Sequence, residues 1–566
     1  MNSKTGLKKI TLFDIIFILA LSVFSAGVFN VYKYHDFRGV GNPETIYFIL
    51  FTALFFFSFI GVLFVIHVLE EKKFFLPKTE IRIFTPDIKG FLKGTLLISL
   101  CYLPVAIIFY PGVCSWDTIN QLYDYLTGDM PYAYNWGRGQ EQISAFLNDH
   151  HPVFDTFIYV AFYNLGQTVG NLKAGIFIYS LTCMVLTSGA FSYMICLINR
   201  LKIRLPKVPL LLFMLLMPFL AVYSFSMIKD SLFGLVFVWF FAVIIDILFN
   251  KSTRKKLVAL IIVSVLLSLT KKTGVYIVVP SVFALLFSKA PSDFNYKKYI
   301  FPAFIVPAVL IFVILPKIIF PIANIWPGGK QEVFGTLFQQ TARVELDKPY
   351  YYSSVEKEVI DRVFDFNHIK DNYRYEVSDG IKDTYRFYST DGDRKAYLKV
   401  WMKTGLNNPF TYFKATAGNS GGFFAPAQTI ELHKNMTEQK MVPGMDNIES
   451  FQNIRKAYIN TYEFITSIPV VILLFSNVLY AFWIPVFMIV RGIKSKKRNL
   501  IIVTIPIILS LLVLIVSPNS HIRYGIHLLY IAPMLIALGL FSKKTSDKKQ
   551  DEQLEKDVHK GINHTV

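Results

Sequence analysis

The chain has 566 residues, of which 53% are hydrophobic, 16% aromatic and only 17% charged, and its mean hydropathy is +0.44. Ordinary soluble domains carry about 25% charged residues, so these values exclude a soluble globular protein, a disordered chain and a disulfide-rich scaffold. The 58 Lys and Arg against 39 Asp and Glu give a net charge of +19. On so apolar a chain we expect no nucleic-acid partner. We expect the excess of Lys and Arg to flank the cytoplasmic ends of membrane spans.

Apolar segments of bilayer-spanning length recur along the chain. They predict an all-α polytopic membrane protein with about twelve transmembrane helices, so the lipid bilayer is its first partner. The first segment has no small-residue cleavage site and a second follows closely, which favours a retained helix over a signal peptide. The predicted spans are 11–31, 46–69, 95–111, 172–198, 208–226, 231–250, 256–270, 274–289, 299–320, 464–490, 499–517 and 523–541.

A weaker apolar run at 153–169 decides the topology. If it does not cross, the segments on one side hold 31 Lys and Arg and the short loops on the other side hold 8. If it crossed, the basic clusters at 200–207 and 491–498 would face outward, against the positive-inside rule. We therefore predict a juxtamembrane helix over 151–170 in the outer interface, and both termini in the cytoplasm.

Five regions follow from this topology. The polar segment between the ninth and tenth spans is long enough for a small, mainly helical external domain, and the charged end of the chain is typical of disorder. The regions are 1–94 (a two-helix membrane addition and cytoplasmic loop), 95–320 (a transmembrane core with external loop 112–171), 321–463 (the external domain), 464–541 (the C-terminal transmembrane helices) and 542–566 (a disordered cytoplasmic tail).

The four cysteines are Cys101, Cys114, Cys183 and Cys196, and the predicted external domain contains none. Their spacing offers neither a disulfide framework nor a CxxC metal site. An external domain without cysteine is common in Gram-positive bacteria, so we expect a bacterial plasma-membrane protein.

Polar residues at the predicted outer helix ends are the main chemical signal, because charge beside a span is costly and is often functional. The first cluster is the stretch YPGVCSWDT, where Pro-Gly ends the third span and Asp117 follows at the surface. Asp117 is a candidate catalytic carboxylate, or a cap for a helix that begins near Ile119.

The second cluster is Asp149-His150-His151 before the juxtamembrane helix. Asp149 or His150 could cap that helix. The three residues could also position a substrate or, with Asp117 or Asp230, hold a divalent cation such as Mg²⁺ or Mn²⁺. The identity of any metal stays open.

The third cluster, Lys229-Asp230, occupies a very short turn between the fifth and sixth spans. It offers a second carboxylate, or simply a local ion pair that lets the hairpin turn.

The fourth cluster is Lys271-Lys272-Thr273-Gly274, whose lysines break the positive-inside trend. Two lysines beside backbone N–H groups resemble a phosphate-binding corner, although lysines can also reach lipid phosphates. Before the last span, Arg523-Tyr524 adds a cation suited to bidentate phosphate recognition.

Together these clusters place carboxylates and cations on one face of one bundle. That combination favours chemistry between a phosphate-bearing lipid and a polar acceptor. A channel would carry charged residues in the middle of its spans, where these predicted spans have few.

The pattern resembles the membrane glycosyltransferases of the GT-C type, a superfamily that includes protein O-mannosyltransferases, aminoarabinose transferases and oligosaccharyltransferases. In that class an Asp in the first large external loop precedes juxtamembrane helices, and a second acidic residue lies in the next external turn. Asp117 matches the first position, DHHPVFDTFIYVAFYNLG resembles the juxtamembrane segment, and Asp230 in MIKDS matches the second. More narrowly, residues 95–541 resemble an uncharacterised bacterial family of GT-C-like proteins through LTKKTG, FQQTARV, WMKTGLNNPFTYF and HIRYGIHLLYIAP. No WWDYG-type motif occurs, which disfavours transfer of a whole oligosaccharide.

The resemblance implies a GT-C bundle that transfers a sugar from a polyprenyl-phosphate donor to an extracytoplasmic glycan, lipid or protein, with inversion. Asp117 would be the general base, with Asp230 as the second catalytic carboxylate. The implied phosphate-binding residues are Lys229, Lys271, Lys272 and Arg523, and the implied positioning residues are Asp149, His150, His151 and Tyr524.

Two other functions remain open on the sequence. A transporter or flippase for a lipid-linked or anionic precursor would need a polar path and repeat symmetry, and neither is evident. A non-catalytic scaffold of envelope assembly would use 321–463 for binding. In that domain Trp401, Tyr412 and Phe413 could stack on a sugar or pack in the core.

Overall fold

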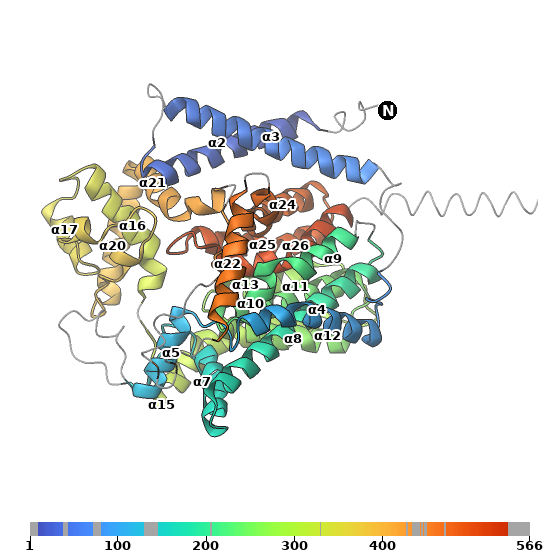
Figure 1. Cartoon of the computed structure of the whole chain (residues 1–566). Helices are drawn as coiled ribbons and strands as arrows, with labels where there is room; N and C mark the ends of the chain where they lie inside the picture. The colour runs from blue at the N-terminus through green and yellow to red at the C-terminus, as the bar shows by residue number, and fades with distance from the viewer. Residues whose placement is uncertain are drawn as a thin grey trace, which may run out of the picture.

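The computed structural model describes residues 10–541, apart from 38–43, 72–80, 129–144, 204–206, 329, 426–427, 433–441, 443–444, 446–449 and 469–470. The predicted tail 542–566 and part of the predicted loop 112–152 lie outside this description. Within it, helices form nearly all of the regular structure (Figure 1). The paired strands are two residues each, β1 (Leu147–Asn148) and β2 (Ile325–Trp326), and they run parallel.

Long apolar helices confirm an all-α polytopic membrane protein. Seven described helices are long and apolar enough to cross a membrane, or eight if the pair α9–α10, bent by 52°, forms one span. The predicted number of about twelve stays a prediction. The helices that coincide with predicted spans are α2 (Leu12–Tyr34), α3 (Glu44–Glu71), α4 (Ile88–Ile108), α8 (Leu172–Arg200), α9 (Lys207–Leu216), α10 (Pro218–Phe225), α11 (Lys229–Phe249), α12 (Arg254–Thr270), α13 (Gly274–Ala284) with η1 (Leu285–Phe287), α14 (Lys297–Val309) with π-helical η2 (Leu310–Ile319) and α15 (Phe320–Ile322), α25 (Arg498–Ile515), and α26 (Ile526–Phe541) after η6 (Ile522–Gly525).

The predicted span 464–490 is not one helix. An amphipathic helix, α22 (Gln452–Ser467), ends inside it, and α23 (Ile472–Phe475), π-helical η5 (Leu479–Trp483) and α24 (Ile484–Lys494) follow. The chain breaks at Ser476, where ψ is extended, and the buried amide oxygen of Asn477 accepts a hydrogen bond from the backbone N–H of Ile430. Because a side chain that bonds backbone elsewhere competes with helix propagation, an apolar run here does not make a continuous span.

Helix α11 is the centre of the bundle. Its described residues are among the most buried in the chain, and it packs against α8, α12 and α26. Gly234 allows the close approach to α26, since a Cβ there would lie 2.8 Å from a methyl carbon of Ile526. A helix that is apolar on all sides belongs inside a bundle. The position of α11 therefore sets where Lys229 and Asp230, at its start, and Asp246, near its end, lie in the bundle.

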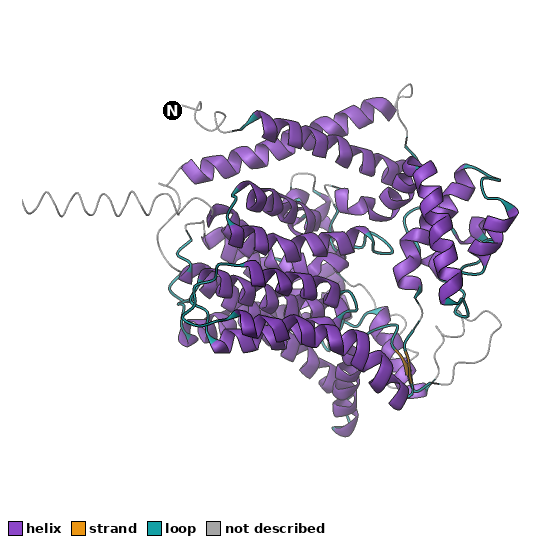
Figure 2. Cartoon of the chain, turned by 180° about the vertical axis from the view of Figure 1, so that it is seen from behind, coloured by secondary structure: helices purple, strands orange, loops and turns teal. Residues whose placement is uncertain are grey.

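The helices between Gln331 and Phe424 form a unit with its own apolar core, set to one side of the long helices (Figures 1 and 2). Phe338 lies at the centre of this core, with its ring 4.4 Å from that of Phe364 and 5.6 Å from that of Tyr397. Capping boxes start two of the helices, at Ser353 and Thr390. The helices are α16 (Gln331–Asp347), α17 (Ser354–Asp361), α18 (Ile369–Asn372), α19 (Asp379–Lys382), α20 (Asp391–Asn407) and α21 (Pro409–Ser420), with η3 (Gly421–Phe424).

The aromatic residues of this unit pack inward. The rings of Trp401 and Tyr412 stack at 5.7 Å, Trp401 Nε1 donates to Gln340 Oε1, and the Tyr412 hydroxyl donates to the carbonyl of Trp401. Phe413 packs against Phe24 of α2 at 6.0 Å. Core packing, rather than sugar stacking, therefore accounts for these three rings.

Two short helices lie beside the bundle at the end where α8 begins. These are α5 (Trp116–Thr127) and α7 (Val153–Thr168), and α7 runs across the direction of the long helices (Figure 1). Helix α7 is not among the helices long and apolar enough to span, and it coincides with the predicted juxtamembrane segment, whose place in the outer interface stays a prediction. We call this end of the bundle the α7 end.

The opposite end gathers residues predicted to be cytoplasmic. Arg200 and Lys256 both pair with Asp246, at the C-terminal end of α11, and Lys494 pairs with Asp14 at the start of α2. We call it the Asp246 end. The predicted inner residues are thus neighbours in space although far apart in sequence.

Candidate functional site

Backbone pairing brings the Asp117 segment to the start of α11. The backbone N–H of Met227 donates to the carbonyl of Val113 at 2.7 Å, and the Thr118 hydroxyl donates to the carbonyl of Met227 at 2.5 Å. Ser115 is the N-cap of α5, because its side chain accepts from the N–H of Thr118. Asp117 therefore lies in the first turn of α5 and is not the cap considered from the sequence.

Lys229 and Asp230 do not pair with each other. Lys229 Nζ lies 3.1 Å from Asp117 Oδ2 and 2.9 Å from His151 Nδ1. Asp230 is 1% exposed, and its Oδ1 lies 2.7 Å from Lys271 Nζ. The alternative of a local ion pair is wrong: the short turn sends these neighbours to different partners.

Arg523 joins the two carboxylates. Its Nη2 is 3.3 Å from Asp117 Oδ2, and its Nε is 3.7 Å from Asp230 Oδ2. Neither Arg523 Nε nor Asp230 Oδ2 makes a hydrogen bond, although both atoms are buried. The ring of Tyr524 lies against Lys271, with 5.2 Å from Nζ to the ring centroid. Hydrogen-bonding capacity is thus left over at the centre of the site.

Lys272 pairs with Asp149 at 2.9 Å, and Asp149 Oδ1 accepts from the N–H of Val153, the first residue of α7. Lys271 and Lys272, for which contact with lipid phosphates was one alternative, therefore each pair with a carboxylate of the protein, and Lys272 stays partly exposed. The predicted backbone corner is also not free, since the N–H of Gly274 donates to the carbonyl of Lys271 at 2.8 Å. Gly274 serves packing, because a Cβ there would lie 2.2 Å from the carbonyl oxygen of Leu267.

The paired positions lie together at the α7 end, as a linked group of five residues and the separate pair Lys272–Asp149, and we call them the charged cluster. It draws on five segments that are far apart in sequence. Its members are Asp117, Asp149, Asp230, Lys229, Lys271, Lys272 and Arg523.

The protonation of Asp117 is set by these neighbours. Burial alone raises the pKa of Asp117, but the charges of Lys229 and Arg523 outweigh burial and hold the pKa well below its usual range. Burial dominates at Asp149 and raises its pKa despite Lys272. Asp117 is therefore a firmly ionised carboxylate, not a ready proton acceptor.

The histidine doublet is turned toward cations and a carboxylate. Burial and Lys229 hold the pKa of His151 well below its usual range, and burial lowers the pKa of His150 to about 3. His150 Nδ1 lies 4.0 Å from Glu332 Oε1, and Glu332 pairs with Lys382 at 2.8 Å. The doublet thus joins the charged cluster to helix α16.

The predicted divalent-cation site does not fit these residues. The nitrogen His151 Nδ1 already faces the ammonium of Lys229. Within the described residues, no group of three or more His, Cys, Asp or Glu is arranged to hold a metal ion. We therefore assign the chemistry below to side chains.

One buried carboxyl of this region was missed from the sequence. Asp155, in the first turn of α7, is 0% exposed, and neither of its oxygens makes a hydrogen bond. Its buried face also carries Tyr159 and Tyr163. That spacing of four was visible in the sequence, and it places Asp155 on the packed side of an amphipathic helix.

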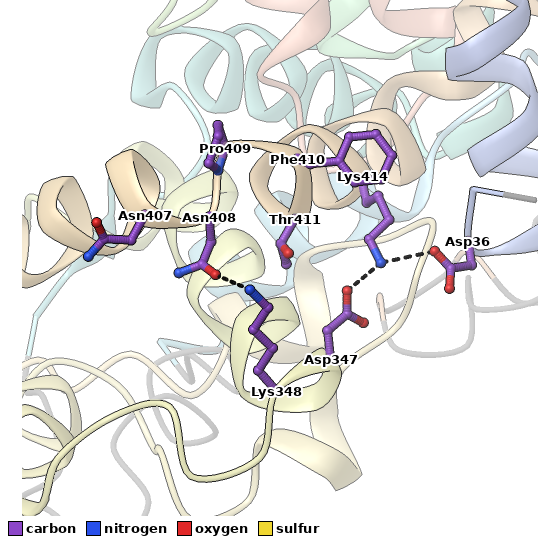
Figure 3. A pocket seen from close by; sticks show the side chains of 9 residues that line it. All are labelled: Asp36, Asp347, Lys348, Asn407, Asn408, Pro409, Phe410, Thr411 and Lys414. Atoms are coloured by element: carbon purple, nitrogen blue, oxygen red, sulfur yellow. Dashed lines mark hydrogen bonds and ion pairs between the residues drawn. The ribbon is translucent and has the colours of Figure 1, made fainter. Parts of the chain in front are cut away.

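A cavity of about 460 Å³ lies elsewhere, where the end of α2 meets α16 and α21 (Figure 3). Lys414 bridges Asp36 and Asp347 across it, and Lys348 donates to Asn408 at 2.6 Å. No predicted site residue lines it. Its polar groups bond one another, so we interpret it as the junction that holds the N-terminal hairpin against the helical unit.

The helices and the charged cluster define a polytopic α-helical membrane protein with a buried ionic site at one end. Residues 141–554, more than half of the chain, match the model of a family of unknown function, DUF6020, and the chain belongs to this family. The match includes every member of the charged cluster except Asp117. No curated protein and no solved structure matches the chain.

Proposed function

We propose that this protein is a membrane glycosyltransferase that moves a sugar from a polyprenyl-phosphate donor to an extracytoplasmic acceptor by an inverting displacement. One observation carries the proposal. Four cations and three ion-paired carboxylates from five distant segments converge beside α7, and all of them except Lys272 are largely buried. Burying so many charges is expensive unless they serve a purpose.

The cations suit a phosphate. Arg523 presents a fork of donors, of which Nε is unused, and Lys229 and Lys271 supply point charges on either side. In the transfer, the bond between the anomeric carbon and the phosphate oxygen breaks, and negative charge grows on the departing phosphate. Donors held in place before the reaction stabilise that charge best. Asp230 orients Lys271 and Arg523 and is thus a positioning residue in this scheme.

Asp117 would act as the general base once the donor has bound. The phosphate competes for Lys229 and Arg523, two of the groups that hold the pKa of Asp117 down. When they turn toward the phosphate, the pKa of Asp117 rises and the carboxylate can take the acceptor proton. Donor binding would thereby switch the base on.

The helical unit α16–α21 would select the acceptor. It reaches the site through the pairing of β1 with β2 and through the contact between His150 and Glu332. The nature of the acceptor, whether glycan, lipid or protein, follows from what this unit binds.

A reconstituted assay tests the function. The purified chain in proteoliposomes is given a radiolabelled prenyl-phosphate sugar and an envelope extract as acceptor source. Sugar transfer that wild type performs and Asp117→Asn does not supports the proposal. Movement of the label between leaflets without transfer would instead indicate a flippase, and neither activity would favour a scaffold.

The proposal requires the α7 end to face outward in a bacterial plasma membrane, with both termini inside. Cysteines introduced at exposed Lys255 and Lys395 should differ in whole cells. A membrane-impermeant maleimide should label Lys395→Cys and not Lys255→Cys. The reverse pattern would contradict the orientation and with it the extracytoplasmic acceptor.

A further inference from the structure

The structure contains a fourth carboxyl beside the charged cluster that has no partner. Asp117, Asp149 and Asp230 each pair with a cation. Asp155 lies on α7, which packs against α5, α8 and α12, and it is completely buried without a hydrogen bond to either oxygen. Buried polar atoms without partners are rare in native proteins and call for an explanation.

The surroundings of Asp155 disfavour its ionised form. Burial holds the pKa of Asp155 well above its usual range, and the charges of Asp230 and Asp149 add to this effect, whereas Lys229 and Lys271 oppose it. On its own helix the next inward group is Tyr159, whose ring packs edge-on against Tyr179 of α8 at 5.7 Å. The Tyr159 hydroxyl has no hydrogen-bond partner among the described residues. Within the described part of the chain neither oxygen of Asp155 has a hydrogen-bond partner, whereas the other three carboxylates each pair with a cation.

The protonation of Asp155 decides the net charge of the site. The cluster holds four cations, Lys229, Lys271, Lys272 and Arg523, and three paired carboxylates. With Asp155 neutral, one positive charge is left over. With Asp155 ionised, the four cations and four carboxylates cancel, and the site has no surplus charge for an incoming anion.

We propose that Asp155 determines the affinity of this site for an anion: held as a neutral acid, it leaves one surplus positive charge that matches a singly charged phosphodiester. This rests on the proposed function in that the anion is the phosphodiester of a prenyl-phosphate sugar. The atoms left without hydrogen bonds, Arg523 Nε above all, are the places where that anion would be received. Binding the anion and keeping the proton on Asp155 then favour each other by linkage.

The experiment measures binding and needs no transfer. The full-length protein in nanodiscs is titrated by calorimetry between about pH 6 and pH 10 with geranyl phosphoglucose, a phosphodiester whose charge stays constant over this range. A second arm uses dimethyl phosphate, which distinguishes a lipid-linked ligand from a free phosphate group. Wild type should lose affinity for the lipid-linked probe by about tenfold or more as Asp155 ionises, since one charge at close range is worth more than a pKa unit in a buried site.

Asp155→Asn should bind as wild type does near neutral pH and should keep its affinity at high pH. Asp155→Leu, neutral and of similar size, serves if the Asn variant does not fold. Asp365→Asn is the matched control, because Asp365 is a buried carboxyl of the helical unit, and it should titrate like wild type. Wild-type affinity that is as independent of pH as that of Asp155→Asn would overturn the inference and leave the proposed function standing. No binding of either probe by any variant would overturn both.

Discussion

Each end of the bundle buries an aspartate of helix α11, and the two aspartates have different hydrogen-bond and ion-pair partners. At the Asp246 end, Oδ2 of Asp246 accepts from the Tyr193 hydroxyl at 2.7 Å, Oδ1 accepts from Asn250 at 2.8 Å, and Arg200 and Lys256 lie within 3.3 Å. At the α7 end, Oδ1 of Asp230 has Lys271, while Oδ2 has only Arg523 at 3.7 Å and no hydrogen bond. The side chains of both aspartates are 1% exposed.

We interpret this difference as one between a structural network and the candidate binding site. Neutral partners complete the bonding of Asp246, so nothing remains for a ligand, and the network joins α8, α11 and α12. The charged cluster contains no such neutral partners around Asp230, and its members keep unused donors and acceptors. A polar network that is fully satisfied rigidifies a protein, whereas one that is incomplete gains from binding the missing group.

The largest expected effect is on Asp117→Asn. The amide keeps the shape of the side chain and cannot act as a base, so we expect the transfer rate to fall by about 10²–10⁴-fold. The rate is measured per amount of folded protein, with unfolding temperature as the control for structure. Transfer at the wild-type rate would remove Asp117 as the base.

Arg523→Ala should reduce transfer by roughly 10²–10³-fold, the effect of losing one preorganised donor to a developing charge. Arg523→Lys keeps the charge and loses the fork, so its loss should be smaller. The comparison of KM for the donor with kcat distinguishes binding from catalysis. Equal activity of the two variants would argue against recognition by the guanidinium fork.

Asp246→Ala tests the other end of the comparison. Leaving Arg200 and Lys256 without their carboxylate should destabilise the protein by about 3–5 kcal/mol, seen as a lower unfolding temperature in nanodiscs. The affinity of the remaining folded protein for geranyl phosphoglucose should not change. A loss of affinity without a loss of stability would mean that the two ends are coupled or that the inner network is itself a site.

The smallest expected effect is in the response to acid. Because the folded pKa of Asp117 lies below its unfolded value of about 3.9, its ion pairs contribute stability that is fully present above that value and is lost as the pH falls through the folded pKa. Below about pH 4 the unfolding temperature of wild type should therefore fall more steeply with pH than that of Asp117→Asn.

Bound donor should change this acid response. If the phosphate takes over Lys229 and Arg523, the pKa of Asp117 rises and the acid limb of transfer shifts upward in pH with donor saturation. An acid limb that is the same for kcat and kcat/KM would contradict the idea that donor binding activates the base.

Much of the architecture was accessible from the sequence, because apolar length and basic flanks act locally. The juxtamembrane helix coincides with α7, and eleven of the twelve predicted spans coincide with helices. The exception, 464–490, contains the break at Ser476 and Asn477, where a side chain bonds a backbone 47 residues away. Hydropathy depends only on how many apolar residues a segment contains, so it cannot detect such a contact.

The sequence predicted which charged residues would lie together, but it suggested some of the wrong pairs. Lys229 and Asp230 were adjacent and so were considered as a pair, yet they bond Asp117 and Lys271. Asp155 was overlooked because a carboxyl one turn into a helix looks like an ordinary N-terminal charge. Its isolation exists only after α7 packs against the bundle.

The sequence by itself determined the class of protein, the positions of most helices and which end of the bundle collects which charges. These follow from the transfer of side chains out of water, a property of each segment alone. Only the tertiary structure decided which carboxylate meets which cation and which groups are left incomplete. Those outcomes depend on distances of a few ångströms between segments hundreds of residues apart, such as Asp117 and Arg523, and in a buried site such distances set the strength of every charge.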